Sequence, residues 1–419
     1  MTPRSPGRLP SRGIGATFPA GRRHGAAGLP LTENPTMRQR SAAPAIAATL
    51  LALGAALVAP AAAQPGRGPR TPGDTLKSPV VGENGRVTFQ LYAPKATEVT
   101  LRSEGPAPFA NQKLTQSEAG VWTLSTTVPA DLYIYWYDVD GVPVADPRNN
   151  RPRVNLTTVR SLLEVPGAAS EFFAERAVPH GTVSAVWYHS KSLGVPRRMH
   201  VYTPPDYATS GRRYPVFYLL HGAGDNDQSW LMAGQANFIL DNLIAAGKAK
   251  PMVVVMPAGH TPRPGGLFGP PGSRDPFLDD FAQDVMPYVE RSYRLLPGRE
   301  NRAIAGLSMG GGHTLAIALP NLDKFSQIGV FSSGFLGAGG PDSVATAHRA
   351  VLSDPKTNGR IKLFWLATGK EDFILQITKG TLAVLDRHGI KYTYKETEGG
   401  HTWPNWRAYL NEFAPMLFR

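Results

Sequence analysis

The chain has 419 residues, which allows two or three domains, and its 42% hydrophobic content is enough for a sizeable core. It contains no cysteine, which excludes a disulfide scaffold, a thiolate metal site and a cysteine nucleophile. The formal net charge is +12, but half of it falls within residues 1–63 and the rest is spread without a dense basic run, so we expect no nucleic-acid partner.

Residues 37–63 have the pattern of a secretory signal peptide. Arg38 and Arg40 precede an apolar run over residues 45–58, and three alanines follow before Gln64. A short basic region, an apolar run and an A-x-A site are typical of such a signal, whereas a membrane span needs about 20 apolar residues. We expect a secreted or periplasmic bacterial protein with no stable membrane association after cleavage; a retained membrane anchor is the alternative.

Two further segments are expected to lie outside the folded domains. Met37 stands where a signal peptide normally starts, so residues 1–36 are interpreted as upstream, non-structural sequence. Residues 64–79 are rich in Pro, Gly and Arg, a composition typical of a linker. Folded structure is therefore expected from about residue 80 onward.

Residues 80–165 have the pattern of a small immunoglobulin-like β-sandwich. Apolar and polar residues alternate over short stretches that turn residues separate, as at Val87, Phe89 and Leu91. An aromatic run at residues 133–137 follows one such turn. Its side chains can form a platform on which a sugar ring stacks, or they can form the core of the sandwich and a packing surface for the next domain. The pattern leaves both interpretations open.

Residues 170–419 have the pattern of an α/β fold in which strands and helices alternate. Two strands are expected within residues 181–203, and later ones at residues 215–220, 252–256, 302–305, 325–331, 361–367 and 391–395. The first two of these later strands are continuous apolar runs. Helices are expected at residues 236–246, 279–293, 311–318, 378–388 and 403–418. This order implies a mostly parallel sheet with helices on both faces, and such sheets bind ligands at the carboxyl ends of their strands.

The sharpest motif is the run Gly306-Leu307-Ser308-Met309-Gly310, which follows a short strand and opens a helix. That context is typical of a nucleophile elbow, a tight turn that exposes a serine hydroxyl. The glycines remove the Cβ atoms that would clash in such a turn. Ser308 is therefore the candidate nucleophile, and the alternative is an ordinary serine in a glycine-rich turn.

A base and an acid follow Ser308 in the chain. His401 is the one histidine after the last predicted strand, and a neutral imidazole can accept the serine proton and return it to the leaving alcohol. The alternative for His401 is a buried structural residue. Glu371 and Asp372 come directly after a strand, and either carboxylate can reach the histidine. We favour Asp372, because its spacing from Gly369 leaves a short turn that can point the side chain at the loop of His401. The resulting order Ser, Asp, His is that of α/β-hydrolases.

Two backbone N–H groups are expected to hold the oxyanion that forms when the serine attacks. Met309 supplies one, because it follows the candidate nucleophile. Ala223 is favoured for the other, with Gly222 next, since both lie in the loop after the strand at residues 215–220. His221 in the same loop is either a spare base or a buried residue that shapes the loop.

Three residues are candidates for contact with the substrate: Trp230, His260 and Trp403. Trp230 either walls the pocket or caps a helix. His260 belongs to a long Pro- and Gly-rich loop, which is either a binding loop or a solvated connector. Trp403 either meets the acyl group or packs against the loop of His401. No metal site and no cofactor are expected.

The segments LLHGAGDNDQSW, AGLSMGGGHTLAIAL, LATGKEDF and GGHTWPNWRAYLNEF resemble carbohydrate esterase family 1, which includes feruloyl and acetylxylan esterases and relatives of enterochelin esterase. The resemblance covers about residues 180–419. It implies an α/β-hydrolase fold and a metal-free serine hydrolase whose triad is Ser308, Asp372 and His401. Residues 80–150 resemble early-set modules related to carbohydrate-binding module family 48.

The expected function is a secreted serine carboxyl-ester hydrolase that removes feruloyl or acetyl groups from plant polysaccharide or related carbohydrate esters through an acyl-enzyme. An acyltransferase or a siderophore esterase of the enterochelin type is the alternative on the same fold. A carbohydrate-binding protein with a silent hydrolase domain is a third interpretation. The acyl group, the polysaccharide and the oligomeric state are left open by the sequence.

Overall fold

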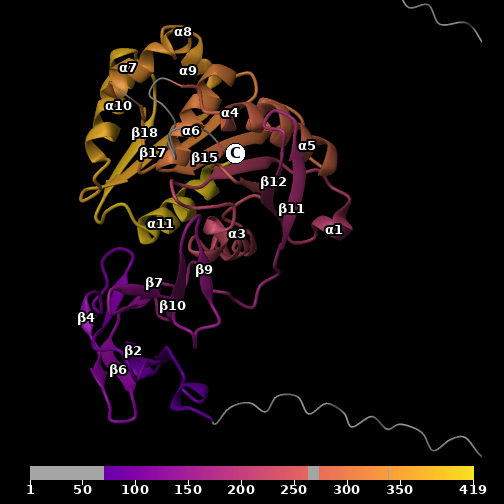
Figure 1. The fold of residues 1–419 in the computed structure, drawn as a ribbon. Helices are drawn as coiled ribbons and strands as arrows, with labels where there is room; N and C mark the ends of the chain where they lie inside the picture. The colour runs from indigo at the N-terminus through magenta and orange to yellow at the C-terminus, as the bar shows by residue number, and fades with distance from the viewer. Residues whose placement is uncertain (1–69, 263–272, 338) are drawn as a thin grey trace, which may run out of the picture. The chain divides into compact units, whose positions relative to one another are not determined.

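The computed structural model describes residues 70–262, 273–337 and 339–419 (Figure 1). The predicted signal peptide, the sequence before it and the first part of the predicted linker lie outside these described residues. Within the described ranges, every helix is too short or too polar to cross a membrane.

Two antiparallel sheets form the N-terminal module, residues 80–165. The first sheet contains, in spatial order, β1 (Val80–Val81), β2 (Arg86–Tyr92), β6 (Val121–Thr127) and β5 (Thr115–Gln116). The second contains β4 (Gln112–Lys113), β3 (Val99–Ser103), β7 (Asp131–Val139), β10 (Val159–Val165) and β9 (Pro152–Val154), with β8 (Val142–Val144) paired to β7. Val87, Phe89 and Leu91 are buried in one core, as their alternation predicts. The predicted β-sandwich is confirmed.

The aromatic run of β7 contributes to that core at alternate positions. Tyr135 and Tyr137 are fully buried, and their hydroxyls donate to Asp146 Oδ2 at 2.7 and 3.2 Å. Ser78 Oγ donates to the same oxygen at 2.6 Å. A buried carboxylate is stable only with such donors. These two tyrosines are therefore core residues and do not form a sugar-stacking platform.

Residues 70–79 differ from the predicted linker, because they are packed against the N-terminal module. Arg148 donates from Nε to the carbonyl oxygen of Leu76 at 2.9 Å and from Nη2 to that of Asp74 at 3.2 Å. Ser78 is 5% exposed. These contacts are polar and join residues about 70 positions apart, so a composition rich in Pro, Gly and Arg gives no signal of them.

An eight-stranded sheet forms the second part of the described chain. Its strands, in spatial order, are β11 (Thr182–Ser190), β12 (Val195–Thr203), β14 (Val253–Pro257), β13 (Val216–Leu220), β15 (Arg302–Leu307), β16 (Gln327–Phe331), β17 (Leu363–Gly369) and β18 (Thr393–Thr397). β11 and β12 pair antiparallel and the other six strands run parallel. The predicted α/β-hydrolase architecture is confirmed.

Helices cover both faces of this sheet (Figure 1). One face packs against α3 (Ala236–Ala245) and α11 (Trp403–Phe413). The other packs against α4 (Phe277–Asp280), α5 (Met286–Ser292), α6 (Met309–Ala318) and α10 (Leu375–Arg387). The remaining α-helices of the described residues are α1 (Tyr207–Ser210), α2 (Ser229–Met232), α7 (Gly340–Thr346), α8 (Arg349–Leu352) and α9 (Thr357–Arg360). Coverage on both faces explains why the central strands are apolar throughout.

The parallel register brings the carboxyl ends of five strands to one edge of the sheet. Leu220 of β13 pairs with Gly306 of β15, and Leu307 of β15 pairs with Phe331 of β16. Gly369 of β17 pairs with Thr397 of β18. The loops that follow these strands therefore meet at this edge, where ligands bind in open α/β sheets.

Candidate active site

Ser308 occupies the single position between the end of β15 and the start of α6. Its φ is 51° and its ψ is −121°, a conformation that costs energy for a residue with a side chain and is concentrated at functional sites. Its N–H donates to the Phe331 carbonyl oxygen at 2.9 Å, and Ser333 Oγ donates to its carbonyl oxygen at 2.6 Å. These two bonds hold the turn while the Ser308 side chain stays partly exposed.

Two glycines permit the close approach that this turn requires. A Cβ atom at Gly306 would lie 2.3 Å from the carbonyl oxygen of Gly310. A Cβ atom at Gly310 would lie 2.5 Å from the carbonyl oxygen of His221. Neither distance is tolerable for a real side chain, so the glycines of the motif place the start of α6 directly against the loop that follows β13.

His401 pairs with Asp372 at the same edge of the sheet. Its Nδ1 lies 2.9 Å from Asp372 Oδ1 and 3.1 Å from Oδ2. Because an ionised carboxylate can only accept, Nδ1 carries the proton and Nε2 is left as the basic nitrogen. Burial acts to raise the pKa of the Asp372 carboxyl, but the bonds from His401 and from the Ile374 N–H outweigh it and hold that pKa below its ordinary value. Glu371, the other carboxylate considered, is exposed.

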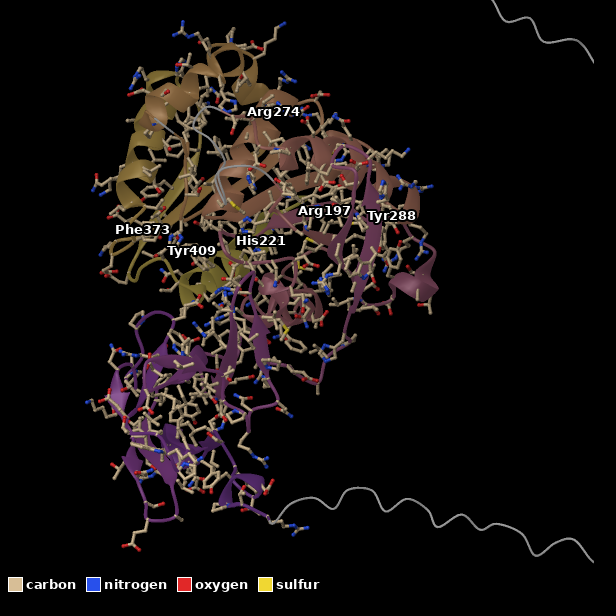
Figure 2. All side chains as sticks on the ribbon, viewed as in Figure 1. Arg197, His221, Arg274, Tyr288, Phe373 and Tyr409 are labelled. Atoms are coloured by element: carbon tan, nitrogen blue, oxygen red, sulfur yellow. The ribbon has the colours of Figure 1, made fainter. Side chains whose placement is uncertain are left out.

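Two aromatic rings flank His401. The Phe373 ring lies 4.4 Å from the imidazole between centroids, and the Trp406 ring lies 5.0 Å from it. Trp406 is buried, whereas Phe373 is 75% exposed. Figure 2 labels Phe373 among the side chains of this part of the molecule. Sequence reasoning missed Phe373, although its position next to Asp372 was a usable signal.

The loop of residues 221–225, called the 221–225 loop below, lies beside Ser308. A Cβ atom at Gly222 would lie 3.3 Å from Ser308 Cβ. Among the described residues, no acceptor takes a hydrogen bond from the N–H of Ala223 or of Met309. Ala223 is exposed. The arrangement therefore offers two unused N–H donors beside a serine hydroxyl, which is the requirement for stabilising an oxyanion.

Two histidines shape this loop. His221 is buried. Its Nδ1 donates to the carbonyl oxygen of Gly222 at 2.8 Å, and its Nε2 accepts from the Gly259 N–H at 2.8 Å. Burial lowers the pKa of His221 to about 3. With both nitrogens engaged, His221 has no free base to offer. His260 Nε2 accepts from the Gly224 N–H at 3.0 Å, so this candidate for substrate contact also holds the loop.

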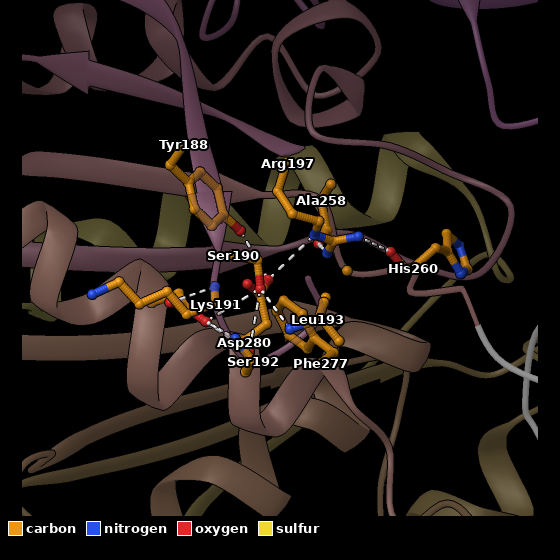
Figure 3. A network of polar contacts seen from close by, with 12 residues as sticks. Tyr188, Ser190, Lys191, Ser192, Leu193, Arg197, Ala258, His260, Phe277 and Asp280 are labelled. Carbon is orange, nitrogen blue, oxygen red and sulfur yellow. Dashed lines mark hydrogen bonds and ion pairs between the residues drawn. The ribbon is translucent and has the colours of Figure 1, made fainter. Parts of the chain in front are cut away.

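Arg197 of β12 fixes the segment that carries His260. It donates to the carbonyl oxygens of Ala258 and His260, and its Nε lies 3.3 Å from Asp280 Oδ2 (Figure 3). Tyr188 donates to the same carboxylate oxygen at 2.8 Å. Charged hydrogen bonds of this kind are stronger than neutral ones. Sequence reasoning did not single out Arg197, because an isolated arginine on a strand gives no signal of its partners.

Trp230 and Trp403 are buried, with 1% and 3% of their surface exposed. Trp230 Nε1 donates to the carbonyl oxygen of Leu220 at 3.0 Å. The two rings pack edge to face, 5.3 Å apart between centroids. Their burial agrees with the packing alternative for Trp403, and neither ring is exposed to meet a substrate. A sequence pattern does not distinguish a tryptophan in the wall of a pocket from one packed beneath its loops.

Residues 190–417 match the model of the family named Esterase, which is more than half of the chain. The chain belongs to this esterase family. It is 32% identical over 351 residues to an endo-1,4-beta-xylanase/feruloyl esterase of Xylanibacter ruminicola, a match that covers 81% of this chain and 46% of that protein. The chain thus spans less than half the length of that relative.

Two solved structures share the fold. A CE1 ferulic acid esterase of Anaeromyces mucronatus, in complex with ferulic acid, matches with a TM-score of 0.51 and 24% identity, over 61% of this chain and 98% of that one. The enterobactin esterase of Shigella flexneri, in the presence of enterobactin, matches with a TM-score of 0.57 and 17% identity, over 79% and 92%. The predicted resemblance to carbohydrate esterase family 1 is confirmed; the likeness to carbohydrate-binding module family 48 stays a prediction.

Proposed function

We propose that this chain is a serine carboxyl-ester hydrolase that removes feruloyl or acetyl groups from acylated plant carbohydrate. The pairing of His401 with Asp372, at the sheet edge where Ser308 stands in a strained turn, is the observation that carries the proposal. The names of the relatives support the substrate class, since they include feruloyl and ferulic acid esterases. Within the described residues, no group of three or more acidic, His or Cys side chains is arranged to hold a metal.

The proposed reaction is a double displacement. Ser308 Oγ attacks the ester carbonyl carbon while His401 Nε2 accepts the hydroxyl proton. The carbonyl oxygen, now negative, receives the N–H groups of Met309 and Ala223. The C–O bond then breaks and the alcohol leaves with the proton from His401. Water repeats the sequence on the acyl-enzyme and releases the carboxylic acid.

Asp372 and Phe373 have distinct parts in this proposal. Asp372 keeps the His401 proton on Nδ1 and stabilises the imidazolium that forms when the serine is deprotonated. Phe373 offers an exposed ring beside the base. An aromatic pair gains about 0.5–1.5 kcal/mol beyond the burial of its area, so this ring favours a phenolic acyl group such as feruloyl over acetyl.

Export belongs to the proposal as well, with residues 37–63 as the signal peptide. Amino-terminal sequencing of the mature protein tests it. A mature chain that begins close to residue 64 supports export by this signal, and one that begins near Met1 rejects it.

The proposed function is tested with Ser308→Ala. We expect kcat on p-nitrophenyl acetate and on methyl ferulate to fall by a factor on the order of 10⁶, because the triad acts as a unit. Ser343→Ala, at an exposed serine of α7, is the matched control and should keep wild-type rates. Near-wild-type hydrolysis by Ser308→Ala would refute the assignment.

Substrate class is tested by chromatography of the acids released from feruloylated, acetylated arabinoxylan. Release of ferulate or acetate supports the proposal. Parallel reactions with an added sugar acceptor, and with a cyclic catecholate triester, identify the alternatives: a transferred acyl group indicates an acyltransferase, and preferential cleavage of the triester indicates a siderophore esterase.

A further inference from the structure

The N-terminal module reaches the 221–225 loop through the hairpin of β9 and β10. The Leu156 N–H donates to the carbonyl oxygen of Gly224 at 2.9 Å. Asn226 Nδ2 donates in the other direction, to the carbonyl oxygen of Val154 at 2.7 Å. The loop that carries Ala223 is thus hydrogen-bonded at one end to a segment that lies outside the family match at residues 190–417.

An ion pair reinforces this contact. Arg153 of β9 is 2% exposed, and its Nη2 lies 2.6 Å from Asp225 Oδ1. Its Nη1 lies 2.5 Å from Glu104 Oε2 within the module. Asp225 is buried as well. Removing one partner of a buried pair leaves the other charge uncompensated, so the position of Asp225 depends on Arg153.

Asp225 in turn lies close to the reacting groups. Its N–H donates to the carbonyl oxygen of Gly222 at 3.3 Å, which closes the turn around Ala223. A Cβ atom placed on Gly222 would lie 3.6 Å from Asp225 Oδ2 and 3.3 Å from Ser308 Cβ. Arg153 is thus paired with Asp225, Asp225 is hydrogen-bonded to Gly222, and Gly222 lies beside the serine with no room for a side chain between them.

Building on the proposed function, we infer that Arg153 is a positioning residue that acts through Asp225 to hold the Ala223 N–H where the oxyanion forms. The N-terminal module then contributes to the chemical step, whatever it does toward carbohydrate. A displacement of about 1 Å in a catalytic group can cost on the order of 10²-fold in rate, so a loop held from outside its own domain makes kcat sensitive to that contact.

Arg407 provides a matched control. It is also a buried arginine that joins the two parts of the chain, with 1% of its surface exposed. It donates from Nη1 to the carbonyl oxygen of Ala233 at 2.8 Å and from Nη2 to Asp131 Oδ1 at 2.5 Å. None of these partners belongs to the 221–225 loop. A purely structural role for such arginines predicts the same kinetic effect at both sites.

The test compares Arg153→Met with Arg407→Met in the full chain, below the melting temperature of each variant. We expect Arg153→Met to lower kcat by about 10- to 100-fold, with KM changed less than about twofold. The variant should also bind phenylboronic acid, a mimic of the tetrahedral intermediate, less tightly, in parallel with the fall in kcat/KM. Arg153→Lys should recover part of kcat. Arg407→Met should keep kcat within about twofold. Equal losses at the two sites, or full activity in Arg153→Met, would overturn the inference.

A second pair of variants serves if Arg153→Met does not fold. Leu156→Pro removes the N–H that donates to Gly224, whereas Leu156→Ala keeps it. Both variants shorten the same side chain, which is 47% exposed in the wild-type protein. We expect the fall in kcat to be at least threefold larger for the proline variant, the size of one lost neutral hydrogen bond; equal rates would overturn the inference. An active Ser308→Ala would instead sink the proposed function itself.

Discussion

The two halves of the candidate site are held in place by different means. Ser308, Asp372 and His401 follow three strands of one sheet, and backbone turns and one ion pair within residues 190–417 fix them. The 221–225 loop has few bonds of its own and depends on side chains from elsewhere. The acid–base half, which consists of Ser308, Asp372 and His401, is therefore complete within the family segment. The other half, the loop that supplies the Ala223 N–H, draws on the N-terminal module.

A buried aspartate in each half shows the same contrast. Burial acts to raise the pKa of both carboxyls. At Asp372 the donors His401 and Ile374 N–H outweigh burial and the pKa falls below its ordinary value. At Asp225 burial outweighs the attraction of Arg153 and raises the pKa to about 6. The Asp372 carboxylate thus stays ionised at neutral pH, whereas that of Asp225 takes up a proton near pH 6.

The largest effect should come from the acid–base half. Asp372→Asn leaves the geometry nearly intact but allows the wrong tautomer of His401, so we expect kcat to fall roughly 10³- to 10⁴-fold. Glu371→Gln, at the exposed neighbouring carboxylate, is the control and should leave kcat unchanged. Steady-state kinetics on p-nitrophenyl acetate decide between them, and a reversed ranking would show that His401 relies on Glu371.

A smaller effect is expected on the family side of the 221–225 loop. His260→Ala removes the acceptor of the Gly224 N–H, a neutral hydrogen bond worth about 1 kcal/mol, so kcat should fall about fivefold. His189→Ala, at an exposed histidine of β11, is the control. If His260→Ala costs more than Arg153→Met, the loop is held mainly from within the family segment and the comparison above is reversed.

The smallest effect is a dependence on pH. Above pH 6 the ionised Asp225 pairs with Arg153, and below it the carboxyl is protonated. The ratio of wild-type kcat to that of Asp225→Asn should therefore fall from about twofold at pH 8 toward one at pH 5, since a charged hydrogen bond at the weak end of its range, about 1.5 kcal/mol, exceeds a typical neutral one by about 0.5 kcal/mol. A ratio that does not vary with pH would show that the charge of Asp225 has no part.

Unfolding at low pH does not explain the expected fall in the ratio of the two kcat values. Because the folded pKa of Asp225 is raised, its contribution to the unfolding free energy increases as pH falls from about 6 toward the ordinary value of 3.8. His221, with a pKa near 3, stays neutral throughout the range and is present in both proteins. Chemical denaturation at each pH provides the check.

The sequence allows prediction of the parts of the site whose signal is local. Ser308 stands directly after β15 and His401 four positions after the end of β18, and the structure places both at the carboxyl edge as expected. Arg153 gives no such signal, since its partner Asp225 is 72 positions away, and the motif that contains Asp225 does not point to an arginine partner. Tertiary packing also decides the burial of Trp230 and Trp403. Periodicity missed helices α7 to α9, which are four to seven residues long.

The cluster around Asp146 has a consequence for any shortened form of the protein. Residues 64–79 look dispensable by composition, and a truncation that starts at residue 80 would seem safe. Such a chain lacks the Ser78 hydroxyl and leaves a buried carboxylate with one donor fewer, at a cost of about 1–3 kcal/mol. Trimming the gene no further than residue 70 preserves that donor and the backbone carbonyls to which Arg148 is anchored.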